Sequence, residues 1–306
     1  MQRNLILAVA ALVLLPLLAA ACGGGSSDPK PTVVVGARAT PEEQVLGEIY
    51  AQALRRAGFK VPAVVRLANE PESAPRVLRA GGISAYPDHL STASGLAWAG
   101  ESESVPADVD EAFEAAKSRL EGEEMTALPP APFSSTNLLV AHKATAKKLG
   151  LGNISDIASA GQEQIVIAGI TGCHESINCM EGLEKLYHLT TIGLVSGLGS
   201  YDEVFEQLED GFAELAFIPS TDGRLYARRQ KYTVLEDDKH LFPAGNGIFV
   251  TTPQLLDEAG SDFEDTIVSA QEGLTTEVMQ RLDAEVELEG KQPKAVATRY
   301  LAQSGS

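Results

Sequence analysis

The sequence predicts an α/β protein built from two lobes. Short apolar runs of strand type alternate with amphipathic helical stretches along most of the chain, which is the pattern of sheets with parallel strands. The N-terminal segment has the composition of an export signal. Cleavage after residue 21 of the 306 would leave 285 residues, more than a single hydrophobic core usually holds. The alternation and the length together favour two α/β lobes.

The first 22 residues predict export and lipid attachment. Arg3 makes the start cationic, residues 5–21 are apolar, and the segment ends in small residues. The run is too short, and its exit too glycine-rich, for a confident membrane span. Cys22 follows Leu-Ala-Ala-Ala and resembles the lipidated cysteine of bacterial lipoproteins, although Ala19 stands where such sites usually carry a larger aliphatic residue. We therefore expect a signal peptide at 1–21 and an extracytoplasmic protein anchored through its lipid alone. Plain secretion and an uncleaved anchor are the alternatives.

The individual elements follow from local signals. Residues 22–31 are rich in glycine, serine and proline, so we expect a flexible tether. A strand at 32–36 precedes a helix that begins with Thr40 as N-cap, Pro41 in the first turn and Glu43 in a capping box. Apolar runs predict further strands at 61–67, 138–141, 165–168, 213–218 and 247–251. Helical spacing predicts helices at 73–80, 144–149, 180–187, 202–209, 262–272, 276–287 and 293–301, and a solvated acidic helix within 102–124.

The composition excludes several classes of function. The net charge is −18, and removal of Arg3 with the signal makes it −19. Such a chain lacks the basic patches that bind nucleic acid, and it would not adhere broadly to anionic lipid. The sequence contains no Gly-x-Ser-x-Gly elbow, His-Glu-x-x-His helix or phosphate loop, so an enzyme is disfavoured. We expect no cofactor.

Two cysteines remain beyond Cys22. Cys173 and Cys179 form an even pair, which outside the cytoplasm favours a disulfide. His174 lies between them, so a soft-metal site is an alternative, but only three ligands are visible locally. Free thiols are the third possibility. We expect no metal.

Several short segments resemble one family. They are Val33-Val34-Val35-Gly36, Leu46-Gly47-Glu48-Ile49-Tyr50-Ala51-Gln52, Ala85-Tyr86-Pro87-Asp88-His89, Ala131-Pro132-Phe133-Ser134-Ser135-Thr136, Ser220-Thr221-Asp222-Gly223-Arg224, Leu235-Glu236-Asp237-Asp238-Lys239, Leu282-Asp283-Ala284-Glu285-Val286 and Glu289-Gly290-Lys291. In this order they resemble the substrate-binding proteins of ABC importers for glycine betaine, choline and carnitine. The resemblance covers nearly all of the chain after the tether.

The resemblance implies a periplasmic-binding-protein fold of type II, in which two hinge crossovers join lobes that close on a ligand. We expect lobe one at 32–133 and 238–306, and lobe two at 134–237. The protein would be a monomer that binds a small zwitterion or quaternary amine and delivers it to a membrane permease and its ATPase. A sensory lipoprotein without transport has the same fold and stays an alternative.

The residues at the expected binding positions depart from the family. Aromatic faces hold quaternary ammonium groups, and family members usually build this cage from tyrosines. The corresponding positions here carry His89, Asn137 and Pro219. Tyr86 remains, as either a site residue or a core residue. Each cation–π contact contributes roughly 0.5–2 kcal/mol, so these changes favour a polar, non-quaternary ligand on the same scaffold.

Turns between strands and helices supply further candidates. Arg38 and Thr40 precede a helix N-terminus, where backbone N–H groups favour an anionic group, and Arg38 either joins them or lies on the surface. Thr171 and His174 occupy the equivalent turn of lobe two, with His174 alternatively a neighbour of the disulfide loop.

Thr221 and Asp222 follow a further strand and are expected at the cleft. Asp222 has a second interpretation, as the residue that caps the following turn.

Overall fold

The computed structural model describes residues 29–94 and 106–305. The expected signal peptide, Cys22 and the first part of the tether lie outside these residues, as does the start of the acidic stretch 102–124. The described part of that stretch forms helix α4 (Val109–Glu121). No helix in the described ranges is both long and apolar enough to cross a bilayer.

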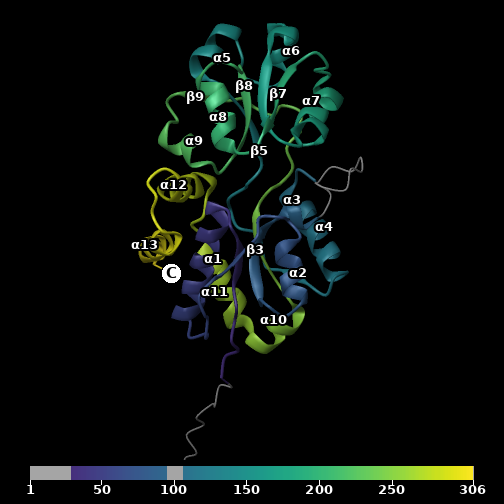
Figure 1. The fold of residues 1–306 in the computed structure, drawn as a ribbon. Helices are drawn as coiled ribbons and strands as arrows, with labels where there is room; N and C mark the ends of the chain where they lie inside the picture. Colours follow the sequence, from purple (N-terminus) through teal and green to yellow (C-terminus); the bar gives the residue numbers. More distant parts are fainter. Residues whose placement is uncertain (1–28, 95–105, 306) are drawn as a thin grey trace, which may run out of the picture.

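Figure 1 shows two α/β lobes joined by two connecting segments of the chain. Lobe one contains strands β1 (Gly36–Arg38), β2 (Val65–Leu67), β3 (Ala85–His89), β4 (Thr126–Ala127) and β10 (Gly247–Thr251). Its helices are α1 (Pro41–Arg56), α2 (Ser73–Arg79), α3 (Leu90–Ala93), α4, α10 (Pro253–Ala259), α11 (Ser261–Gln271), α12 (Thr276–Glu287) and α13 (Pro293–Ser304). β1 pairs with β2 in parallel, and β10 lies antiparallel between β3 and β4. A parallel bridge from Val35 to Ala85 connects the two groups of strands.

Lobe two repeats this order of strands. Its strands are β5 (Asn137–His142), β6 (Val166–Ile170), β7 (Gly193–Leu198), β8 (Leu215–Pro219) and β9 (Tyr232–Val234). They form a sheet in the order β7-β6-β8-β5-β9, with β6 parallel to β7 and β8, and β5 antiparallel to β8 and β9. Its helices are α5 (Lys143–Leu149), α6 (Asp156–Ala160), α7 (Met180–Tyr187), α8 (Tyr201–Glu209) and α9 (Gly223–Ala227), with short 3₁₀ turns η1 (Gln162–Gln164) and η2 (Cys173–Glu175).

Each sheet is buried on both faces, because successive side chains of a strand point to opposite sides. In β10, Phe249 packs with α1, α11 and α13, while Ile248 and Val250 pack on the opposite face with α4. In lobe two, Phe217 and Ile218 of β8 likewise contribute to different cores. Each lobe is therefore a three-layer α/β/α unit, as the alternation in the sequence predicts.

The capping signals at α1 are confirmed. The Thr40 hydroxyl oxygen accepts a hydrogen bond from the Glu43 backbone N–H at 3.3 Å, and Pro41 opens the helix. Pro41 needs no hydrogen-bond donor there, because the first helical N–H groups have no intrahelical partner. This cap fixes where α1 begins and which way it runs. The first turn of the helix, which contains Glu42, faces lobe two.

Two crossovers connect the lobes and run side by side. The first leads from β4 to β5, and the second from β9 to β10. The Ser135 N–H donates to the Gly245 carbonyl at 2.8 Å, and Ser134 pairs with Asn246 in an antiparallel bridge. Along the second crossover, Phe242 still packs in the core of lobe two and Ala244 in that of lobe one.

The lobes also meet where α9 packs against α12, below the teal and green lobe in Figure 1. The approach is close because α9 begins with Gly223: a Cβ atom there would lie 2.4 Å from the backbone nitrogen of Ala284. The Gln280 amide donates to the Ser220 carbonyl at 2.6 Å across the same contact. A missing side chain thus brings the end of β8 close to the carboxylates of α12.

Gly223→Ala should lower the free energy of unfolding by about 1–3 kcal/mol, because the added methyl group overlaps backbone atoms of α12. Urea denaturation would measure it. The matched control is Gly152→Ala, where the nearest atom to the new Cβ is an Asp156 carboxylate oxygen at 3.6 Å. The control should change stability by less than about 0.5 kcal/mol. Equal effects of the two substitutions would contradict the close contact between α9 and α12.

Candidate functional site

Two adjoining cavities occupy the space between the lobes. One is about 360 Å³ and the other about 550 Å³, and both are lined by Ser135, Tyr201 and Pro219. Both volumes are in the range that holds a small solute. We call the first the hydroxyl-lined cavity and the second the acidic cavity, after the side chains described below.

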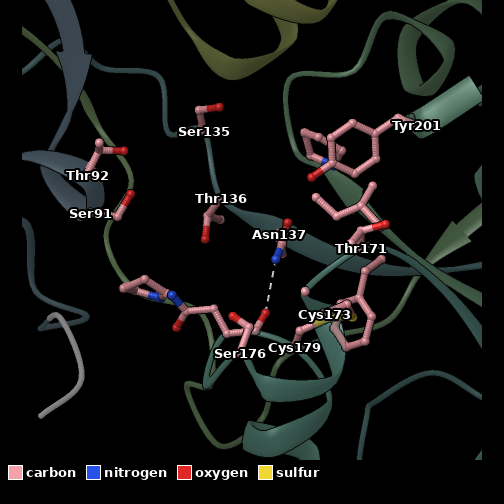
Figure 2. Close-up of a pocket in the computed structure, with 16 residues that line it drawn as sticks. Ser91, Thr92, Ser135, Thr136, Asn137, Thr171, Cys173, Ser176, Cys179 and Tyr201 are labelled. Carbon is pink, nitrogen blue, oxygen red and sulfur yellow. Dashed lines mark hydrogen bonds between the residues drawn. A yellow bond between two sulfur atoms is a disulfide. The ribbon is translucent and has the colours of Figure 1, made fainter. Parts of the chain in front are cut away.

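The hydroxyl-lined cavity is shown in Figure 2. Ser91 and Thr92 of lobe one lie across from Thr171 and Tyr201 of lobe two, with Asn137 between them. The Asn137 amide donates to the Asn178 carbonyl at 3.0 Å, and the Thr171 hydroxyl donates to the Leu198 carbonyl at 3.0 Å. These bonds orient the two side chains. Among the described residues no group donates to the side-chain oxygen of Asn137, and its amide has a second N–H, so the cavity offers hydrogen-bonding groups of both kinds.

A disulfide forms part of this lining. Cys173 and Cys179 are joined, with 5.3 Å between their Cα atoms, and both line the hydroxyl-lined cavity. His174 lies between them in η2, but it is exposed and does not line either cavity. The sulfur atoms therefore hold the turn after β6 and are not available as metal ligands.

The acidic cavity centres on the Glu42 carboxylate at the start of α1. Its oxygens accept hydrogen bonds from the hydroxyls of Ser135, at 3.1 Å, and Thr221, and one lies 2.5 Å from His89 Nε2. Burial acts to raise the pKa of Glu42, but the charge and hydrogen bond of His89 and the two hydroxyls outweigh it and hold that pKa below its usual range. Burial likewise opposes protonation of His89, yet the Glu42 charge raises the pKa of His89. The two form a buried ion pair.

A second group of carboxylates belongs to α12. Asp283 and Glu287 lie one helical turn apart, and both line the acidic cavity. Asp283 is 3% exposed, and its Oδ1 has no hydrogen-bond partner among the described residues. Burial, followed by the charges of Glu42, Glu287 and Asp222, raises the pKa of Asp283 well above its usual range. Burial also raises the pKa of Glu287, against the opposing charge of Arg224.

Arg224 is the main cation at this edge of the cleft. It pairs with Asp222 at 3.0 Å and with Asp202, and its guanidinium stacks on the Phe205 ring at 4.8 Å. Asp222 also accepts the Arg224 backbone N–H at 2.8 Å, so it caps α9 and lines the cavity at once. Both interpretations of Asp222 from the sequence therefore apply.

Of the remaining expected residues, Arg38 and Tyr86 lie outside both cavities. Arg38 is buried and its guanidinium binds Glu43 at 2.8 Å and Asp88 at 2.6 Å, so it contacts neither cavity. Tyr86 is fully buried, and it faces a separate cavity beside Met125. Thr40 lines the acidic cavity, but its hydroxyl serves the cap of α1.

The structure adds site residues that the motifs did not single out. In the sequence Glu42 is one residue of a helix start, and Asp283 is one residue of a family-like motif. The four-residue spacing between Asp283 and Glu287 is a usable signal in the sequence, since it places two carboxylates on one face of a helix. Tyr201 lines both cavities, and burial together with the charge of Asp222 raises its pKa to about 12, which keeps its hydroxyl protonated.

Two α/β lobes, paired crossovers and a polar cavity between them define a solute-binding protein of the periplasmic-binding type. The profile of the OpuAC family, described as the substrate binding domain of ABC-type glycine betaine transport systems, matches residues 31–303. The chain belongs to this family. Its members bind solutes for ABC transporters and are not enzymes. The resemblance expected from the short motifs is confirmed.

Individual relatives agree with this assignment. The carnitine transport binding protein OpuCC of Listeria monocytogenes is 25% identical over 281 residues, which span 89% of this chain and 86% of the relative. The glycine-betaine-binding protein of Pseudomonas aeruginosa is 26% identical over 301 residues, spanning 88% and 87%.

Solved structures confirm the type II fold. A glycine betaine/carnitine/choline ABC transporter protein superposes with a TM-score of 0.77 at 23% identity, over 89% of this chain and 98% of that one. Lactococcal OpuAC, in its closed form with glycine betaine, gives 0.59 at 13% identity, over 90% and 96%.

Asp283→Asn should stabilise the ligand-free protein by about 1–3 kcal/mol at pH 7, because it removes a buried carboxyl group whose raised pKa makes folding take up a proton at this pH. In the unfolded chain this carboxyl ionises near pH 3.9, whereas in the folded protein its raised pKa retains the proton, so its contribution to stability falls as pH rises above about 4. The difference between the variant and the wild type should therefore disappear below about pH 4.

Urea denaturation at a series of pH values would measure this difference. The control is Asp257→Asn on the exposed face of α10, which should show no such pH dependence. A variant that is less stable than the wild type at pH 7 would contradict the unpartnered state of Asp283.

Proposed function

We propose that this protein is an exported lipoprotein that binds a small solute between its lobes and delivers it to an ABC permease and its ATPase. The observation that carries the proposal is the polar cleft to which both lobes contribute. Hydrogen-bonded crossovers allow hinge closure in folds of this kind, and Glu42 of lobe one already contacts Thr221 of lobe two. Family membership supplies the permease and the ATPase as partners.

The relatives' names indicate carnitine and glycine betaine, so the first candidate ligand is a zwitterion or quaternary amine of that class. A specific observation favours the alternative, a polar ligand without a quaternary nitrogen. His89 is committed to Glu42 and lies edge-on to Phe133, at 6.3 Å between ring centroids, while Asn137 and Pro219 bring no aromatic face. Each cation–π contact contributes roughly 0.5–2 kcal/mol. Because these positions bring no aromatic face, the cleft lacks much of the usual attraction for a quaternary nitrogen.

The proposal includes an address. Cys22 would carry the lipid after removal of 1–21, and 22–31 would tether the protein outside the cell membrane. We further propose that the folded part acts as a monomer with lobe one at 32–133 and 238–306 and lobe two at 134–237. The crossovers and cores described above support a division into these two lobes, although Leu241 and Phe242 pack in the core of lobe two and place the second boundary nearer Ala244.

A bound solute should raise the midpoint of thermal unfolding. At a hundredfold excess over Kd the expected stabilisation is about 2.7 kcal/mol. Differential scanning fluorimetry with a broad panel of small zwitterions and amines would identify the solute, and radiolabelled uptake should disappear in cells that lack this chain. Binding without any loss of uptake would favour a sensory protein. Chemical turnover of the solute would overturn the proposal.

Cys22→Ala should abolish metabolic labelling with radioactive palmitate and release the protein from the membrane fraction, because no other anchor is proposed. A double variant, Cys173→Ala with Cys179→Ala, is the control and should keep both label and membrane association. Unchanged labelling of Cys22→Ala would contradict the lipid anchor.

A further inference from the structure

The carboxylates of the acidic cavity differ in how well they are neutralised. Glu42 has His89 and two hydroxyls, and Asp222 has Arg224. Glu43, which also lines this cavity, has Arg38. On α12 the balance is different.

The Asp283 side chain is buried, with 3% of the residue exposed, and its Oδ1 has no hydrogen-bond partner among the described residues. Glu287 has the Gly223 backbone N–H and only the more distant charge of Arg224. A buried polar atom without a partner is rare in native proteins, and it costs free energy because it has lost its hydrogen bonds to water. Because Asp283 lines a cavity, a bound group is the natural partner for this oxygen.

We propose that the acidic cavity binds a cationic group bearing N–H donors, a primary or secondary ammonium or a guanidinium, through Asp283 and Glu287. This inference rests on the proposed function and specifies the class of solute. The cation's hydrogen atoms satisfy Asp283 Oδ1, and its charge offsets the excess of carboxylates over Arg224 and His89.

A quaternary nitrogen fits this cavity less well. It has no N–H to donate, so Asp283 Oδ1 would remain without a hydrogen bond. Phe, Trp and Tyr side chains are also scarce: in the described lining of the acidic cavity only Tyr201 belongs to this group. A hydrogen bond to a charged group contributes about 1.5–3 kcal/mol, which exceeds a single exposed cation–π contact of about 0.5–1 kcal/mol.

The rest of the solute extends into the hydroxyl-lined cavity. The two cavities share Ser135, Tyr201 and Pro219, so a molecule of a few carbon atoms reaches from one to the other. The Thr171 hydroxyl already donates its hydrogen to the Leu198 carbonyl, so it accepts a hydrogen bond from a hydroxyl group of this part. A carboxylate on this part accepts from the second N–H of the Asn137 amide, whose first N–H is bonded to the Asn178 carbonyl. The solute is therefore an amine with a polar tail.

Matched pairs of compounds test the role of the N–H donors, because trimethylation removes them and keeps the charge. Suitable pairs are ethanolamine with choline, glycine with glycine betaine, and 4-amino-3-hydroxybutanoate with carnitine. Isothermal titration of the purified protein should show that, in at least one pair, the member with N–H groups binds at least about tenfold more tightly, as 1.4 kcal/mol predicts.

Asp283→Asn should weaken that amine at least about tenfold, and Asp257→Asn should leave its affinity unchanged. If Asp283→Asn fails to fold, as judged by circular dichroism, Glu287→Gln takes its place with the same expectation. Tighter binding of the quaternary members with no effect of Asp283→Asn overturns the inference and leaves the proposed function intact. No binding of any pair or of the broad solute panel overturns both.

Proton release gives an independent readout. The ionisable groups that line this cavity with Asp283 are Glu42 and Glu43 of α1, His89 of β3, Tyr201 and Asp202 of α8, Asp222 and Arg224 at α9, and Glu287 of α12. Burial raises the pKa of Asp283 well above its usual range, and it also raises the pKa of Asp222 to about 7 and that of Glu287. A bound cation therefore draws protons from this group of carboxyls, and the difference between the wild type and Asp283→Asn isolates the share of Asp283. Titrations in buffers of different ionisation enthalpy should show net proton release for the wild type and less for Asp283→Asn. Equal release by the two overturns the inference.

Discussion

The buried carboxylate of Glu42 is the interaction on which the arrangement of the cleft depends. A lone ionised carboxylate in the interior would cost several kcal/mol, so its partners must be held in place. They come from three parts of the chain: His89 from the end of β3, Ser135 from a crossover and Thr221 from the turn after β8. The first turn of α1 adds its own N-terminal dipole, which favours the charge. The Glu42 side chain thus contacts residues of both lobes and of the first crossover.

The rest of the cleft follows from where strands end. Asn137 begins β5, Thr171 follows β6 and Thr221 follows β8, so one edge of the lobe-two sheet supplies polar groups to both cavities. From lobe one, α12 brings Asp283 close because α9 begins with Gly223, which has no side chain to separate the helices. Sheet topology therefore yields the hydroxyl-lined cavity, and one tight helix contact completes the acidic one.

Much of the fold was predictable, and the exceptions have physical causes. Buried strands such as β8 and β10 are continuous apolar runs, and α1 carries a complete capping signal. β3 was harder to recognise, because Pro87 lies inside it. Proline has no N–H to donate. β3 pairs with β10 along its length but with its other neighbour only near Ala85, so the missing N–H of Pro87 breaks no hydrogen bond of the sheet. β7, with two glycines and an exposed edge position, gave no clear period.

The site was less predictable because pairing is a property of the folded structure. Arg38 looked available for an anion, yet Glu43 and Asp88 neutralise it internally, and Asp283 looked like an ordinary helical residue, yet it is left without a partner. Composition shows acidity but not which carboxylate is unpaired. That distinction decides the chemistry of the cleft. On the proposed function, closing the lobes over Asp283 without a ligand would bury an unsatisfied group, whereas a bound cation would remove this cost, so ligand and closure would stabilise each other.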